Sequence, residues 1–260
     1  MRRYPLARRL ALIRSRETTR PTWGVTALDG KPGRRGHVTA TIPAAEFSAV
    51  RRTAKSVGAT VNDVLLAAFY RALFRELAPA EGRPMAVNVS FDMRRYLDAD
   101  DPMPPASNLS SVETTLVARI ADETFADTLE RTVAEMTRLK AGRPGLSLAM
   151  LMQHARLLGA RRFERMVIEP MGRGRQHGVS FPFLSNFGVL ESGSLTFDDA
   201  VPVSAVILPP AGHPPFIMLG PSSYEGELSL PIGYAEGESD PVALQRLVNG
   251  MAADLVAWGA

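Results

Sequence analysis

Residues 58–77, with the sequence GATVNDVLLAAFYRALFREL, contain the strongest helix signal in the chain. Gly58 is a typical helix C-terminal residue and closes a helix predicted at 44–56. Thr60 is a favourable N-cap for a second helix predicted at 61–77. Apolar side chains recur there at i, i+1, i+4, i+5, i+8 and i+9 and form one apolar stripe, which another layer of the protein must cover. These side chains are Val64, Leu65, Ala68, Phe69, Ala72 and Leu73.

The remaining chain is helical in its middle and rich in strand signals in its second half. Further helices are predicted at 124–139, 146–167 (one or two) and 241–257. Strands are predicted at 37–42, 85–91, 109–120, 179–184, 194–197, 203–208, 216–223 and 228–234. We therefore expect an α/β fold, an α+β two-layer sandwich with helices packed on one face of a single mixed sheet.

Composition excludes several classes of protein. The chain has 260 residues, of which 45% are hydrophobic and 22% charged, so it is not a disordered protein. The longest apolar runs, such as 64–70, are far shorter than the roughly 20 residues that span a bilayer. Without cysteine, thiolate metal sites and a cysteine nucleophile are excluded, and the four scattered histidines form no metal motif. We expect no metal, no transmembrane segment and a cytoplasmic protein.

Positive charge is concentrated near the N-terminus. Residues 1–40 contain nine arginines and one lysine against two acidic residues, a net charge of +8, whereas the other 220 residues contain 20 basic and 25 acidic residues, a net charge of −5. We therefore separate a basic arm at 1–35 from a single domain at 36–260. The arm is a solvated connector, a transit peptide, a nucleic-acid arm or a membrane-surface helix.

Common nucleotide and hydrolase motifs are absent from the sequence. No GxSxG, P-loop or EF-hand spacing occurs. The glycine- and arginine-rich segment 172–178 has one residue too many for GxGxxG and precedes a predicted strand instead of a helix. Contact with a phosphate or with CoA is one interpretation of this segment, and a plain loop is the other.

Five segments, taken in order, resemble the condensation-domain superfamily. They are GATVNDVLLAA at 58–68, VSFDMRRYL at 89–97, Asn108 with the strand to 117, LSNFG at 184–188 and SYEGELSL at 223–230. This superfamily of chloramphenicol-acetyltransferase-like acyltransferases includes condensation domains, wax ester synthase/diacylglycerol acyltransferases and alcohol acetyltransferases. The resemblance extends over residues 36–260 and matches only the C-terminal half of such enzymes, with the basic arm in the place of the crossover between halves.

The resemblance implies transfer of an acyl group from a CoA or carrier-protein thioester to an alcohol or amine, in secondary or lipid metabolism. The phosphopantetheinyl thioester would be a substrate, and no other cofactor is implied. The family's HHxxxD motif, which holds the catalytic histidine, is absent, since no two histidines are adjacent. We therefore expect a truncated or split half with no catalytic residue of its own, inactive alone.

Five residues are candidate substrate contacts by this resemblance. Asn62 and Asp63 match the family's ND pair at a helix start, where helix capping is the alternative role. Ser185, Asn186 and Gly188 match a loop that faces the family's active site, where hydroxyl and amide donors would stabilise a thioester oxyanion. The alternative for this loop is a simple turn at a strand end.

Two arginines are candidate interface residues. Arg94 or Arg95 matches the arginine that pairs in the family with the HHxxxD aspartate across the interface between halves. Without that aspartate, we expect the guanidinium to be hydrated or paired elsewhere, because burying it alone is costly. The partner would be an N-terminal half or a carrier protein. A non-catalytic binding half is the alternative function, and nucleic-acid or membrane binding by the arm is a third.

Overall fold

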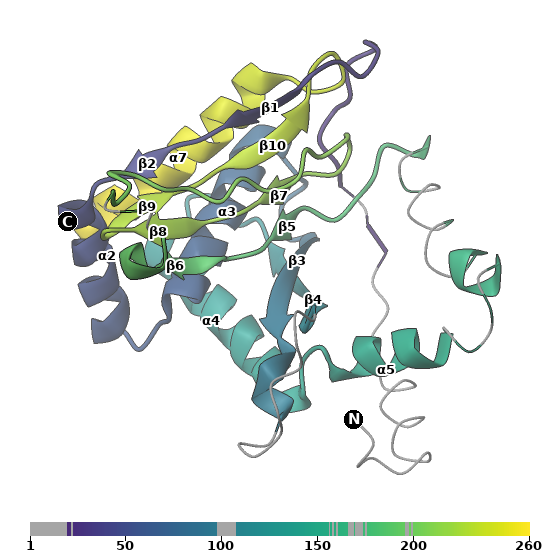
Figure 1. Cartoon of the computed structure of the whole chain (residues 1–260), viewed down its shortest axis with the longest axis horizontal. Coiled ribbons are helices and arrows are strands. Elements are labelled where there is room, and N and C mark those ends of the chain that lie inside the picture. Colours follow the sequence, from purple (N-terminus) through teal and green to yellow (C-terminus); the bar gives the residue numbers. More distant parts are fainter. Residues whose placement is uncertain are drawn as a thin grey trace.

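A layer of helices packs against one face of a layer of strands (Figure 1). The computed structural model describes residues 20, 21, 23–97, 108–155, 157, 159, 161–165, 169, 174, 176–195, 198 and 200–260. The predicted α/β fold class is confirmed. Residues 172, 173 and 175 of the 172–178 segment, and residues 1–19 and 22 of the basic arm, lie outside the described residues.

The two helices predicted around Gly58 form with the expected bounds. Helix α2 (Ala44–Ser56) ends just before Gly58, whose φ of +71° is strained for any residue with a side chain. Helix α3 (Val61–Leu77) begins with a capping box, in which the Asp63 backbone N–H donates to Thr60 Oγ1 at 3.3 Å and the Thr60 backbone N–H donates to Asp63 Oδ2 at 2.9 Å. Thr60 is thus confirmed as the N-cap.

The helices predicted at 124–139 and 241–257 form close to their predicted bounds, whereas in the 146–167 prediction the first helix ends at Ala155 and residues 161–165 are again helical. Helix α4 (Phe125–Gly142) and helix α5 (Leu146–Ala155) form the helical middle of the chain. Helix α7 (Pro241–Gly259) begins at an Asp240 cap. Asp240 Oδ1 accepts hydrogen bonds from the backbone N–H groups of Val242 and Ala243. Proline at the first helical position suits this start because it has no N–H to lose.

The strands divide between two hydrogen-bonded sheets instead of forming one. The six-stranded sheet has the order β1 (Arg35–Val38), β10 (Ile232–Ala235), β7 (Met218–Leu219), β5 (Phe183–Leu184), β3 (Pro84–Asp92) and β4 (Ser110–Ala118). The four-stranded sheet has the order β2 (Thr41–Ile42), β9 (Glu227–Ser229), β8 (Ser222–Tyr224) and β6 (Gly188–Leu190). Both sheets are mixed, because β3, β5 and β7 run parallel, as do β6 and β8.

Prolines explain why single predicted strands split. The segment predicted at 216–223 becomes β7 and β8, separated by Gly220 and Pro221, and the segment at 228–234 becomes β9 and β10, separated by Leu230 and Pro231. A proline has no N–H for the ladder and therefore interrupts it. The two breaks lie side by side, since the Gly220 N–H donates to Pro231 O at 3.0 Å.

The prediction of a strand at 203–208 is wrong. This segment is extended but pairs with no strand among the described residues. It is held instead by side chains, with Tyr224 Oη donating to Pro202 O at 2.5 Å and the Ile207 N–H donating to Ser222 Oγ at 3.4 Å. Flanking prolines limit ladder formation, and the β-branched residues Val203, Val206 and Ile207 fit an extended backbone equally well without a partner strand. Residues 192–194 form a short 3-10 turn where the strand at 194–197 was expected, and 196–197 are not described.

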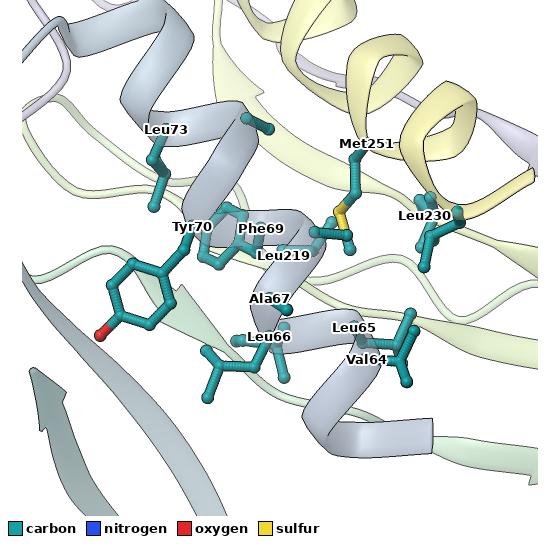
Figure 2. Packing of buried hydrophobic residues seen from close by; sticks show 14 of the residues in the cluster. Val64, Leu65, Leu66, Ala67, Phe69, Tyr70, Leu73, Leu219, Leu230 and Met251 are labelled. Atoms are coloured by element: carbon teal, nitrogen blue, oxygen red, sulfur yellow. The ribbon is translucent and has the colours of Figure 1, made fainter. Parts of the chain in front are cut away.

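The core is centred on α3. Its residues Phe69, Tyr70 and Leu73 are completely buried. Figure 2 shows Phe69 beside Leu219 of β7, and Met251 of α7 over the same cluster. Each fully buried side chain of this size stabilises the fold by about 1.5–3 kcal/mol, so the α3 stripe is a major contributor to stability.

Residues 23–34 lie along the body and precede β1. The Val25 N–H donates to Pro215 O at 3.2 Å, the Leu28 N–H donates to Glu238 O at 2.8 Å, and the Arg83 guanidinium lies 5.2 Å from the centre of the Trp23 ring. This part of the predicted basic arm is therefore fixed by backbone hydrogen bonds. In the described residues, no single helix has the length and apolar character to cross a membrane, and only α2 with α3, bent by 106°, meets that test as a pair.

Replacing Tyr70 by phenylalanine should destabilise the fold. Tyr70 Oη donates to Met85 O at 3.2 Å and lies 2.7 Å from Thr115 Oγ1 in a fully buried site. We expect Tyr70→Phe to lower the free energy of unfolding by about 1 kcal/mol at pH 8, measured by urea titration. Tyr96→Phe, which removes a partly buried hydroxyl, is the matched control.

The same variant tests a pH dependence. Burial raises the pKa of the Tyr70 hydroxyl well above its usual value. A group whose pKa is raised by folding stabilises the protein below its unfolded pKa, here about 10, and that stability is lost as the pH rises further. The stability advantage of the wild type over Tyr70→Phe should therefore shrink between pH 10 and pH 11. A constant advantage over this range would contradict the buried-hydroxyl interpretation.

Candidate functional site

The carboxyl ends of three parallel strands meet at one edge of the six-stranded sheet. Asn88 of β3 is paired with Phe183 of β5, which in turn is paired with Met218 of β7. Ligands of open sheets with parallel strands bind at such carboxyl ends. We call the last residues of β3 and the residues that follow β3 and β5 the carboxyl edge, which we define as Ser90, Asp92, Arg94, Arg95 and residues 185–188.

Ser185 lies at this edge beside a residue that sequence reasoning missed. Its Oγ donates to Ser90 Oγ at 3.3 Å, and its backbone N–H donates to Leu219 O at 3.0 Å. Both serines are partly buried. They place two hydroxyl groups side by side on the sheet face. Ser90 alternates with the buried Val89 and Phe91, so the sequence indicates that it lies on the opposite face of the strand from them. Only the pairing of β3 with β5 brings it into contact with Ser185, 95 positions later in the chain.

Asn186 and Gly188 form the turn that joins the two sheets. Asn186 Oδ1 accepts a hydrogen bond from the Gly188 N–H at 2.9 Å, and Gly188 has a φ of +82°. The Phe187 N–H donates to Pro221 O at 2.8 Å, which fixes the turn against β8. The amide nitrogen of Asn186 makes no hydrogen bond within the described part of the chain. This half-buried N–H₂ group and the serine hydroxyls are the hydrogen-bond donors of the edge.

Asn62 and Asp63 lie at the start of α3. Asp63 is 3% exposed, and its Oδ2 is used by the capping box. Its Oδ1 lies 3.5 Å from Lys140 Nζ of α4. Asn62 Oδ1 is buried and has no hydrogen-bond partner among the residues described. The capping role of Asp63 is therefore established, whereas substrate contact by this pair remains a prediction.

Arg94 and Arg95 follow β3 directly, in the 3-10 turn η1 (Met93–Tyr96). Arg94 Nη1 lies 3.2 Å from Asp92 Oδ1, with 48% and 60% of the two side chains exposed. Such an exposed pair contributes little to stability, at most about 1 kcal/mol. The Arg95 guanidinium lies 5.7 Å from the centre of the Tyr96 ring. Both arginines therefore stand at the carboxyl edge, on the surface, and their proposed role in an interface is untested.

The described histidines are not among the residues that define this edge. His37 is in the edge strand β1, and His213 Nδ1 lies 2.6 Å from Glu238 Oε2, beyond the end of β10. His154 is in α5, where its Nδ1 is 2.7 Å from Met150 O. Within the described ranges, no three His, Asp or Glu side chains group as metal ligands do. The carboxyl edge thus offers hydrogen-bond donors and a surface guanidinium group.

Comparisons with known proteins support the fold and give no sequence relative. No protein-family model matches the chain, and no curated protein matches it in sequence. Similarity appears in solved structures. The chain has the fold of one half of a condensation-type acyltransferase.

Three of these structures show the extent of the similarity. Trichothecene 15-O-acetyltransferase TRI3 from Fusarium sporotrichioides superposes with a TM-score of 0.67 at 13% identity, over 96% of this chain and 51% of the other. The EpoB NRPS cyclization-docking bidomain from Sorangium cellulosum gives a TM-score of 0.60 at 17% identity, over 97% and 48%. The first condensation domain of the CDA synthetase gives 0.56 at 20% identity, over 98% and 50%. The chain spans about half the length of the structures it matches.

Removing the Thr60 cap should destabilise α3. We expect Thr60→Ala to lower the free energy of unfolding by about 1 kcal/mol, because the Asp63 backbone N–H loses its acceptor, Thr60 Oγ1. Thr60→Ser should retain most of the stability, since the hydroxyl remains. Ser56→Ala, at the exposed end of α2, is the control. Equal stability of Thr60→Ala and wild type in chemical denaturation would show that the capping box is unimportant.

Proposed function

We propose that this chain provides one half of a condensation-type acyltransferase, the C-terminal half by the order of its motifs. The observation that supports it best is the carboxyl edge, where Ser90, Ser185 and Asn186 present donors on a fold shared with acyltransferase and condensation domains. The reaction would transfer an acyl group from a CoA or carrier-protein thioester to an alcohol or amine.

Each part of the edge has a chemical role in this proposal. The acceptor hydroxyl or amine attacks the thioester carbonyl carbon, the carbonyl oxygen gains negative charge, and the thiol leaves as the acyl bond to the acceptor forms. Hydroxyl and amide donors stabilise such an oxyanion when they are held rigidly before the reaction. The fixed backbone of Ser185 and the turn at Asn186 provide that rigidity.

The base that deprotonates the acceptor comes from the complementary half, whether on the same polypeptide or on another. This assignment rests on the absence of adjacent histidines from the sequence. Arg94 stands at the carboxyl edge with its guanidinium exposed, and among the described residues its ion pair is with the surface carboxylate of Asp92. Because that pair is weak, Arg94 is free to exchange Asp92 for an aspartate of the complementary half.

Thioester binding without turnover tests this proposal. The purified chain is titrated calorimetrically with acetyl-CoA and longer acyl-CoAs, and thiol release is followed in a mixture of alcohols and amines. We expect binding, no thiol release above the protein-free rate, and binding about fivefold weaker in Ser185→Ala, because one hydrogen bond is lost. Ser56→Ala is the matched control serine on α2.

Three results would contradict it. Robust turnover by the chain alone would show that no second half is needed for the base. No binding of any thioester, or equal binding by Ser185→Ala and wild type, would remove the carboxyl edge from the substrate site.

A binding half without catalysis is the second candidate, and exposed valines beside β8 favour it. Val189 of the edge strand β6 is 64% exposed and lies next to Ser223. Val201 and Val203 are 56% and 99% exposed on the segment that Tyr224 anchors. Exposed aliphatic side chains that gather in one region are typical of protein–protein contacts. The partner would be a carrier protein or the complementary half.

Solution mass distinguishes this candidate. We expect the wild type to self-associate at high concentration through these valines, with a mass above the 28.2 kDa of one chain by light scattering. Val203→Asp should restore a monomer, whereas Val242→Asp, at an exposed valine on α7, should not. A wild-type protein that stays monomeric at every concentration would contradict self-association through these valines.

A further inference from the structure

A groove of about 370 Å³ lies at the end of α3 opposite Thr60, between α3 and the loop that joins β4 to α4. We call it the arginine groove and define it by the side chains of Arg71, Arg75, Arg119, Phe74 and Ile120. None of these residues was singled out by the sequence motifs. The groove therefore requires its own interpretation.

Arg71 and Arg75 lie one helical turn apart and are held by one carboxylate of α7. Asp254 Oδ2 lies 2.8 Å from Arg75 Nη1 and 3.5 Å from Arg71 Nε. Arg71 Nη1 also donates to Glu123 O at 2.9 Å. Of the Arg75 guanidinium, only Nη1 has a hydrogen-bond partner in the described structure. Arg75 is 43% exposed in its side chain, and its Nη2 lies close to Gly250 of α7.

Arg119 faces the groove from the end of β4 without a carboxylate partner. Its Nη1 donates to Pro79 O at 3.2 Å, and no ion pair involves it in the part of the chain that the structure describes. A guanidinium group has five N–H donors, of which this contact uses one. Arg119 and Arg75 thus leave two sets of charged donors unsatisfied by the protein.

The nearby carboxylates are largely engaged. Both oxygens of Glu123 bind Arg131, at 2.7 Å and 2.6 Å, and Glu81 Oε1 accepts from the Ala121 N–H at 2.9 Å. Asp122 is exposed and is the acidic side chain that opposes an anion at the groove. Asp254 is shared by Arg71 and Arg75, and Glu123 is paired with Arg131, so among the described residues Arg119 is the groove arginine whose charge has no carboxylate partner.

An apolar wall completes the groove. Phe74 is almost fully buried beneath it, and Ile120 is 46% exposed at its side. Arg119, which has no carboxylate partner among the described residues, and Arg75, whose hydrogen bonding there uses Nη1 alone, lie beside an apolar surface and match an anion that carries an apolar body. Phosphate suits this arrangement better than carboxylate, because three acceptor oxygens can bridge two guanidinium forks.

We propose that the arginine groove binds a small organic phosphate, with the phosphate between Arg75 and Arg119 and the apolar body on Ile120. This site is independent of the acyltransferase proposal, since it uses none of the carboxyl-edge residues. It gives the protein a second ligand class beyond the thioester and acceptor.

The test is a calorimetric titration of the full chain at low salt with phenyl phosphate, inorganic phosphate and benzoate. We expect saturable binding that is tightest for phenyl phosphate, since only this probe combines the phosphate with an apolar ring. Arg119→Gln should weaken it about tenfold, because a charge-assisted hydrogen bond is lost. Arg52→Gln, an exposed arginine of α2 that contacts Ser48, is the matched control and should bind as the wild type does.

A second variant guards against indirect effects of removing an arginine. Ala121→Asp adds a carboxylate at an exposed groove position and leaves all three arginines in place, and it should also weaken binding. Circular dichroism melts check that both variants fold. The proposal is overturned if phenyl phosphate does not bind saturably, if benzoate binds equally well, or if folded Arg119→Gln and Ala121→Asp bind as tightly as the control.

Discussion

Burial of the α3 stripe between the sheet and helix α7 is the interaction on which the rest of the structure depends. Phe69 and Leu73 are inaccessible to water, and Figure 2 shows Phe69 in the layer between Leu219 and Met251 of α7. Water is excluded from this layer over the full length of the helix, which orients α3 relative to the strands. The capping box at Thr60 sets where the helix begins, and therefore where its N-terminal polar residues stand.

That constraint positions both functional regions. Because α3 runs antiparallel to the strand that follows it, the carboxyl end of β3 lies toward the start of the helix, and the arginine groove lies toward its end. The prolines at 221 and 231 then turn the chain from one sheet into the other beside Ser185. At these prolines the strands lose ladder hydrogen bonds. The turn at 185–188, which carries hydrogen-bond donors of the carboxyl edge, lies beside this break.

The helices could be predicted closely because their signals are local. A cap, a period of 3.6 and a closing glycine gave α2 and α3 with the bounds that the structure has. The strands of the second half were harder, because two- to four-residue strands leave little alternation to detect, and the 203–208 segment satisfies a strand pattern without a partner. The ND pair and the Ser185 turn were found by motif, whereas Ser90 and Arg119 have no local signal that marks them.

The sequence by itself determined the helices, their caps and the fold class, since those follow from side chains within a few turns of one another. It also determined that no HHxxxD histidine pair is present. Only the tertiary structure decided that the strands divide into two sheets, that Ser90 meets Ser185, and that Arg75 and Arg119 share a groove. These contacts join residues far apart in the chain, and their geometry depends on how hydrophobic burial packs the helices on the strands.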